Sequence, residues 1–173
     1  MFINNAQYTC AYNIISIPKY IIKKYIKCNP KKYYELGYIY QYYYKNYELM
    51  KKYYNKAGNS NAMNALGYYY HFNEKKYKLI KKYYKDAIKL GNTNAMYNLG
   101  NYYQFTEKKY DLIEKYYMQA FTLGNPDGMY SLAYYYKFTK YNYDLMKHYY
   151  ICAIKLNHKY SICHILYFYN GLL

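Results

Sequence analysis

The 173-residue chain contains no tryptophan and no arginine, so all 25 of its basic residues are lysines. The chain therefore lacks the planar guanidinium group that commonly grips phosphate or reads guanine through paired hydrogen bonds. It also has only 9 acidic residues, which leaves a formal net charge of +16. These features argue against specific nucleic-acid recognition, while the lysine excess favours non-specific, salt-sensitive association with nucleic acid.

Long apolar runs are missing as well. Nowhere do 18 or more apolar residues follow one another without a charge, so we expect no membrane-spanning helix. Near the start, Lys19, Lys23 and Lys24 interrupt the apolar run that a signal peptide would need. The sequence thus predicts a soluble, intracellular protein of the cytoplasm, or of the host cytoplasm if its source is a virus.

The 37 tyrosines, together with the abundant lysine, asparagine and isoleucine, match the codon supply of an AT-rich genome, such as that of a giant virus or a parasite. Part of the positive charge can therefore record codon supply rather than a ligand. Charge of this kind bears on solubility and non-specific association, not on the fold.

Few residues suit metal binding or catalysis. The four cysteines form no CxxC pair and are expected to be free thiols: Cys10, Cys28, Cys152 and Cys163. His148 and Cys152 are four residues apart and Cys163 precedes His164, but these pairs lack the short-loop spacing of a structural zinc site. The chain has no glycine-rich phosphate loop, no nucleophile elbow and no HExxH motif. We therefore expect neither an enzyme nor a cofactor.

What the sequence does contain is an internal repeat. Residues 61–93, 94–126 and 127–159 match one another with a period of 33 residues. An earlier copy at 31–60 lacks three residues before Gly58, and 160–173 begin a fifth copy that contains one capping helix. The prediction is a single repeat domain over residues 31–173, preceded by a degenerate helical segment at 1–30.

Each unit shows two helical patterns. In the second unit, Ala62, Leu66 and Tyr70 are four residues apart and predict a first helix. After the turn 72–75, apolar positions between 79 and 88 predict a second helix with lysines on its opposite face. A glycine ends the second helix, and Asn94 or Asp127 is predicted to cap the next one. The lysine runs 75–76, 81–82 and 108–109 are expected on the solvated faces of the second helices.

Small residues recur at fixed positions of both helices. The first helices carry Gly37, Gly67, Gly100 and Ala133, and the second helices carry Ala57, Ala87, Ala120 and Ala153. A glycine inside a helix costs about 1 kcal/mol relative to alanine, so its recurrence indicates that neighbouring helices pack closely there. The fold class is therefore all-α, with stacked antiparallel helix pairs.

The pattern Ala-x-x-x-Leu-Gly-x-x-Tyr, followed by Tyr-Tyr-x-x-Ala and a closing Gly, resembles the Sel-one-like repeat, a relative of the tetratricopeptide repeat. The residues that carry it are Ala62, Leu66, Gly67, Tyr70, Tyr83, Tyr84, Ala87 and Gly91, and then Ala95, Leu99, Gly100, Tyr103, Tyr116, Tyr117, Ala120 and Gly124. The chain departs from the family at the 72–75 turn, where a glycine-rich loop is usual, and at Tyr83, where tryptophan is usual. The resemblance implies a right-handed α/α solenoid that serves as an adaptor for proteins or peptides.

The resemblance also implies a binding groove along the first helices. Its predicted residues are Asn61, Asn64, Tyr68, His71, Asn94, Tyr97, Asn101, Gln104, Asp127, Tyr130, Tyr134 and Lys137. Tyrosines offer rigid contact area with a hydrogen-bonding tip, which suits recognition of a protein or peptide. Two alternatives stay open: that many tyrosines only fill packing positions, and that lysine and tyrosine together bind single-stranded nucleic acid.

Overall fold

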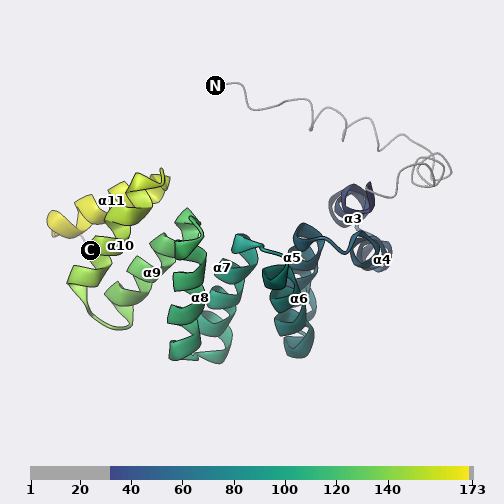
Figure 1. Ribbon diagram of the computed structural model, residues 1–173, viewed down its shortest axis with the longest axis horizontal. Helices are drawn as coiled ribbons and strands as arrows, with labels where there is room; N and C mark the ends of the chain where they lie inside the picture. The colour runs from purple at the N-terminus through teal and green to yellow at the C-terminus, as the bar shows by residue number, and fades with distance from the viewer. Residues whose placement is uncertain (1–31, 172–173) are drawn as a thin grey trace, which may run out of the picture.

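The computed structural model describes residues 32–171. In this part of the chain nine α-helices follow one another: α3 (Tyr33–Tyr42), α4 (Tyr47–Ala57), α5 (Ser60–Tyr69), α6 (Tyr77–Lys89), α7 (Thr93–Tyr102), α8 (Tyr110–Thr122), α9 (Pro126–Phe138), α10 (Tyr143–Lys155) and α11 (Lys159–Tyr169). They form a curved row in chain order (Figure 1). The predicted all-α array of antiparallel pairs is confirmed. The segment 1–30, with Cys10 and Cys28, lies outside the described residues.

The two helices of a unit meet at the recurring glycine. A Cβ atom on Gly37, Gly67 or Gly100 would lie 2.3, 2.5 or 2.6 Å from a ring carbon of a tyrosine in the second helix of the same unit. Those rings belong to Tyr54, Tyr84 and Tyr117. Glycine therefore lets the tyrosine ring lie directly on the helix backbone. In α11 the same position is Leu166, which is 54% exposed.

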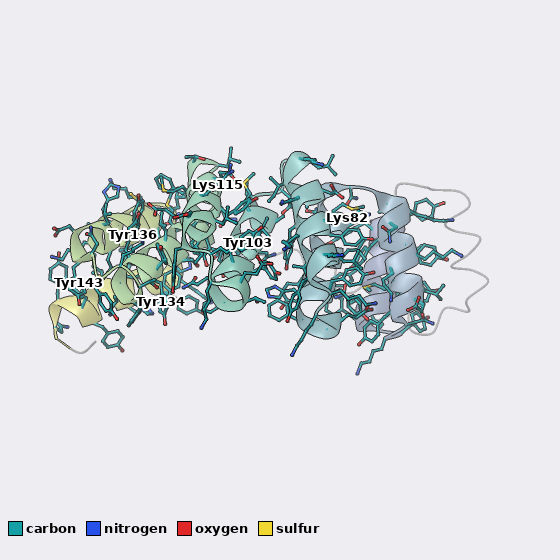
Figure 2. The ribbon with its side chains drawn as sticks, turned by 90° about the horizontal axis from the view of Figure 1, so that it is seen from below. Lys82, Tyr103, Lys115, Tyr134, Tyr136 and Tyr143 are labelled. Atoms are coloured by element: carbon teal, nitrogen blue, oxygen red, sulfur yellow. The ribbon has the colours of Figure 1, made fainter. Side chains whose placement is uncertain are left out.

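A stacked pair of tyrosines joins the two helices of every complete unit. The pairs are Tyr40 with Tyr53, Tyr70 with Tyr83, Tyr103 with Tyr116 and Tyr136 with Tyr149, at ring-centroid distances of 5.3, 5.4, 5.6 and 5.5 Å. Tyr103 and Tyr136 are labelled within the array in Figure 2. Each such pair contributes about 0.5–1.5 kcal/mol beyond the area that it buries. A large share of the tyrosines is thus core material.

Asparagine side chains cap the first helices α5, α7 and α9, but these asparagines are not the residues that we predicted as caps. The side chains of Asn59, Asn92 and Asn125 accept a hydrogen bond from a backbone N–H three residues later, at 2.8, 2.9 and 3.0 Å. The prediction of Asn94 and Asp127 as caps was wrong, because α7 and α9 begin one residue before them. The capping residue thus lies two residues before the predicted one, and it is an asparagine that also recurs with the repeat.

The turn between the helices of a unit is more ordered than the predicted 72–75 loop. After α5 and α7 the chain continues as the π-helical turns Tyr70–Glu74 and Tyr103–Glu107. A residue with left-handed backbone then follows: Lys45, Lys75, Lys108 or Tyr141, with φ between 49° and 53°. This conformation costs a non-glycine residue about 1–2 kcal/mol. The left-handed residue therefore recurs in all four units without glycine, whereas the π-helical turn occurs in the second and third units.

The three residues missing from the first unit shorten its second helix. Helix α4 has 11 residues, whereas α6 has 13. Gly58 follows α4 directly and takes a left-handed φ of 60°, which lets the chain turn at once into α5. The deletion thus falls at a helix end, where the packed face is least affected.

Candidate peptide-binding surface

The first helices α3 and α5 border a hollow of about 360 Å³. It is lined by Tyr34, Tyr38, Gln41, Tyr42, Tyr54, Asn61, Asn64, Ala65, Tyr68 and Asn94. Four of the predicted groove residues thus come together here: Asn61, Asn64, Tyr68 and Asn94. Sequence reasoning missed Tyr34, Tyr38 and Gln41, although a shift of 30 residues places them at the positions of Asn64, Tyr68 and His71.

A second hollow, of about 370 Å³, lies at the turn between the helices. It is lined by His71, Phe72, Lys75, Tyr77, Phe105 and Thr106. His71 Nε2 lies 3.5 Å from Thr106 Oγ1. Burial lowers the pKa of His71 below its usual value, so the imidazole is neutral at pH 7. Lys75 therefore supplies the charge in this hollow.

Exposed aromatic side chains follow the first helices from unit to unit. We call them the aromatic row: Tyr38, Tyr42, Tyr68, Phe72, Phe105, Tyr134 and Phe138. Within it three pairs four residues apart, Tyr38 with Tyr42, Tyr68 with Phe72 and Tyr134 with Phe138, have ring centroids 4.5, 4.5 and 4.4 Å apart. In Figure 2, Tyr134 lies towards one long edge of the array, and Lys115 lies towards the opposite edge.

Several predicted groove residues hold the array together. Asn92 Nδ2 donates to Asn61 Oδ1 at 3.0 Å, and Asn125 Nδ2 donates to Asn94 Oδ1 at 2.9 Å. At the next boundary His158 lies 3.5 Å from Asp127. Each contact joins a residue at the start of one first helix to a residue at the start of the next. These polar positions thus fix the register of neighbouring units.

Other predicted residues support buried tyrosines. The Tyr117 hydroxyl lies 2.5 Å from Asn101 Oδ1 and 2.7 Å from Gln104 Oε1, so the two amide oxygens share its one proton. Burial raises the pKa of Tyr117, which keeps the phenol a hydrogen-bond donor. The half-buried Tyr97 lies 6.3 Å from the Tyr117 ring. The side-chain amides of Asn101 and Gln104 thus hold the buried tyrosine in place, and both residues are half-buried.

The predicted residues of the fourth unit divide between packing and surface. Tyr130 stacks 4.5 Å from the His158 ring, and its hydroxyl lies 3.0 Å from His164 Nε2. Lys137 is only 6% exposed, so the structure places it inside the packing. Its Nζ lies 4.9 Å from the Phe138 ring centre and has no hydrogen-bond partner in the described part of the chain. Tyr134 is exposed and belongs to the aromatic row.

Two carboxylates tie successive units together. Glu74 pairs with Lys51 at 3.0 Å and with Lys76 at 2.6 Å. Glu107 pairs with Lys81 at 2.7 Å and with Lys109 at 2.9 Å. Burial opposes the charge of Glu107, but hydrogen bonds from Lys81, the Tyr102 hydroxyl and Lys109 outweigh it and lower the pKa to about 2.

The lysine pairs before the second helices lie in turns. Helix α6 begins at Tyr77 and α8 at Tyr110, so the expectation that lysines 75–76 and 108–109 belong to helices was wrong. Lys76 and Lys109 pair with glutamates. Within residues 32–171, no ion pair is formed by Lys75 or Lys108.

Among the cysteines and histidines that could have formed a zinc site in α10 and α11, one cysteine and one histidine lie close together. His148 Nε2 lies 3.7 Å from Cys152 Sγ, and both Cys152 and the exposed Cys163 are free thiols. Across the described residues no three His, Cys, Asp or Glu side chains are grouped so that they could hold a metal ion. The same residues include no helix of the length and hydropathy needed to cross a membrane.

Comparison with known proteins gives the fold and no family. No protein-family model matches the chain, and no curated protein matches its sequence. The crystal structure of immunity protein PA5088 from Pseudomonas aeruginosa is similar, with a TM-score of 0.56. The match covers 93% of this chain and 69% of that one at 19% sequence identity. At this identity the likeness shows a shared all-helical architecture.

Proposed function

We propose that this chain is a scaffold that binds an extended segment of another protein along its first helices. The observation that carries the proposal is the aromatic row, whose members are between 36% and 69% exposed. Exposed aromatic side chains that adjoin one another mark interaction surfaces more often than single exposed residues do. The core already uses other tyrosines, so packing does not account for this set.

The row and the two hollows are continuous over the first three units. Tyr38, Tyr42 and Tyr68 line the first hollow, Tyr68 contacts Phe72, and Phe72 and Phe105 line the second. An extended chain laid across them would place side chains in the hollows. The side-chain oxygens of Asn61 and Asn64 accept from Asn92 and Asn98, and their Nδ2 groups are donors that suit the carbonyls of a peptide backbone. The surface is thus suited to binding rather than to catalysis.

Two further lines support a binding role. The resemblance to Sel-one-like repeats implies an adaptor for proteins or peptides. One similar solved structure carries the name immunity protein, which favours a protein partner for this chain as well. Stacked repeats generally present an extended surface of this kind.

The test is selection of random peptides, about twelve residues long, against the purified chain, followed by affinity measurement. Replacing Tyr42, Phe72 and Phe105 together with Ser should weaken binding of a selected peptide by about tenfold or more, because central aromatic contacts dominate such interfaces. Helical circular dichroism should persist, since these side chains are exposed.

The matched control replaces Leu90, Leu123 and Leu156 with Ser. These leucines are 54%, 57% and 38% exposed and directly follow the second helices. Binding should change little in this variant. Failure to select any peptide, or an equal loss in both triple variants, would refute the proposed surface.

A further inference from the structure

Three lysines stand beside the aromatic row at one repeat position. Lys45, Lys75 and Lys108 each come three residues after an aromatic member of the row, namely Tyr42, Phe72 and Phe105. All three lysines are exposed. Lys75 lines the second hollow together with Phe72 and Phe105. Lys75 therefore adds a positive charge to the hollow that Phe72 and Phe105 line, and Lys45 and Lys108 hold the equivalent positions in the first and third units.

These lysines occupy backbone positions that favour glycine. Their φ angles are 49°, 52° and 52°, in the left-handed region. Glycine takes this conformation without the steric penalty that a Cβ atom brings. Three successive units nevertheless carry lysine there. A lysine kept at a strained position in the first three units, where the fourth has Tyr141, indicates that the lysine side chain itself is used.

These three lysines are not paired with acidic side chains of the described part of the chain. The next residue in the later turns, Lys76 or Lys109, pairs with Glu74 or Glu107. Within residues 32–171, Lys45, Lys75 and Lys108 form no ion pair. The imidazole of His71 in the same hollow is neutral. An anionic group entering the hollow would thus meet a free ammonium beside aromatic rings.

We propose that the bound segment is acidic: its carboxylates pair with Lys45, Lys75 and Lys108 while its apolar side chains lie on the aromatic row. This inference rests on the proposed function and adds the chemistry of the partner. Single-stranded RNA would also satisfy the lysines, but the rings at 38 and 42, and at 68 and 72, cover part of each other's faces at 4.5 Å. That arrangement leaves less ring face for stacking of bases.

The first readout is the composition of the selected peptides. We expect enrichment in Asp and Glu next to apolar residues, at about 0.15 M salt, where charges beyond about 8 Å are largely screened. A selected peptide should bind at least about tenfold more tightly than the same peptide with its carboxylates changed to amides. Selection of peptides without acidic enrichment would overturn the acidic partner but leave the proposed peptide surface intact.

The second readout uses the triple variant Lys45→Gly, Lys75→Gly, Lys108→Gly. Binding of the acidic peptide should fall by about tenfold or more, while the thermal midpoint of the chain rises because the backbone strain is relieved. Loss of binding with a gain in stability cannot arise from misfolding. Unchanged affinity in this variant would overturn the inference.

The matched control is Lys52→Ala, Lys82→Ala, Lys115→Ala, which removes the same charge from exposed positions of the second helices. In Figure 2, Lys115 lies near the long edge opposite Tyr134. The affinity of this control variant for the peptide should change by less than about threefold.

An oligouridylate of about twelve nucleotides is the competing probe. If it alone binds and loses binding in the glycine variant, the partner is nucleic acid and the inference is wrong.

Discussion

The units at 94–126 and 127–159 align residue for residue but pack in different ways. In the first of them Gly100 lies under the Tyr117 ring of its own second helix. In the next unit that position is Ala133, and a glycine, Gly128, stands instead where the chain meets the preceding unit. A Cβ atom on Gly128 would lie 2.7 Å from that of Ala120. In the later unit, the position with no room for a Cβ atom thus lies at the boundary with the preceding unit rather than between the two helices of one unit.

Two equivalent positions at successive unit boundaries carry opposite charges. Lys81 pairs with Glu107 between the second and third units. One repeat later these positions hold Glu114 and Lys140. Glu114 accepts a hydrogen bond from the Tyr136 hydroxyl, and Lys140 Nζ lies 6.0 Å from the Tyr135 ring centre. Both boundaries keep one charge of each sign at these two positions, but at the later boundary each charge contacts a tyrosine instead of the opposite charge.

The largest loss of stability should come from a bulky side chain at Gly100, where α7 packs against the Tyr117 ring of α8. Gly100→Leu introduces the residue found at the equivalent position in α11, where Leu166 is exposed. Because the Tyr117 ring and its hydroxyl contacts must shift, we expect a loss of about 3 kcal/mol in the free energy of unfolding. Urea denaturation followed by circular dichroism measures it.

Two controls sharpen this comparison. Ala133→Gly should cost about 1 kcal/mol, mainly through helix propensity. Leu166→Ala should cost less than about 0.5 kcal/mol, since the side chain is largely in solvent. Equal losses for Gly100→Leu and Leu166→Ala would contradict the close approach at Gly100.

A smaller effect should follow from reversing one charge at a boundary. Lys81→Glu sets a carboxylate against Glu107, where the two side chains are 33% and 18% exposed. This partial burial lies between surface and buried pairs, so we expect a loss of about 1–2 kcal/mol. Adding Glu107→Lys recreates the order of charges seen at 114 and 140 and should restore most of the stability.

A double-mutant cycle in urea at fixed salt gives the coupling energy between positions 81 and 107. The control Lys82→Glu changes the same charge on an exposed neighbour and should alter stability by less than about 0.5 kcal/mol. If the double variant loses the sum of the two single losses, charge complementarity does not set the boundary.

The fold could be predicted from the sequence because its determinants recur at the repeat period. The glycines at 67 and 100 and the buried tyrosines at 84 and 117 are visible as a pattern. The caps could have been found in the same way, since Asn59, Asn92 and Asn125 also recur in the printed sequence. The π-helical turns could not, because the residues 70–74 and 103–107 carry no signal that separates a π turn from a loop.

The candidate surface was harder to predict than the fold. A groove position that is half-buried in one unit is buried in another when a different neighbour covers it. Lys137 shows this: its equivalents Gln41 and Gln104 bind tyrosine hydroxyls, whereas Lys137 lies within 6.0 Å of the Phe168 ring centre from α11. Periodicity gives the helix face of a residue but not which partner side chain reaches it.

The smallest effect we predict tests that buried lysine. Gln104 accepts a hydrogen bond from Tyr117 at 2.7 Å, whereas an ammonium at 137 cannot accept one, and the Tyr150 hydroxyl lies 3.5 Å from His164 Nδ1. Lys137→Gln should therefore raise the free energy of unfolding by about 1 kcal/mol. Lys155→Gln, at an exposed position at the end of α10, is the control and should have little effect.

The same variant should change a histidine titration. Burial lowers the pKa of His164, and the nearby charges of Lys137 and His158 lower it further. Because the folded pKa lies below the unfolded one, about 6.5, stability from this group is lost as the pH falls below that value. Removing the lysine charge should raise the His164 pKa in an NMR titration and make the loss of stability in acid smaller. An unchanged pKa together with lower stability would mean that the ammonium is held favourably by the Phe138 and Phe168 rings instead.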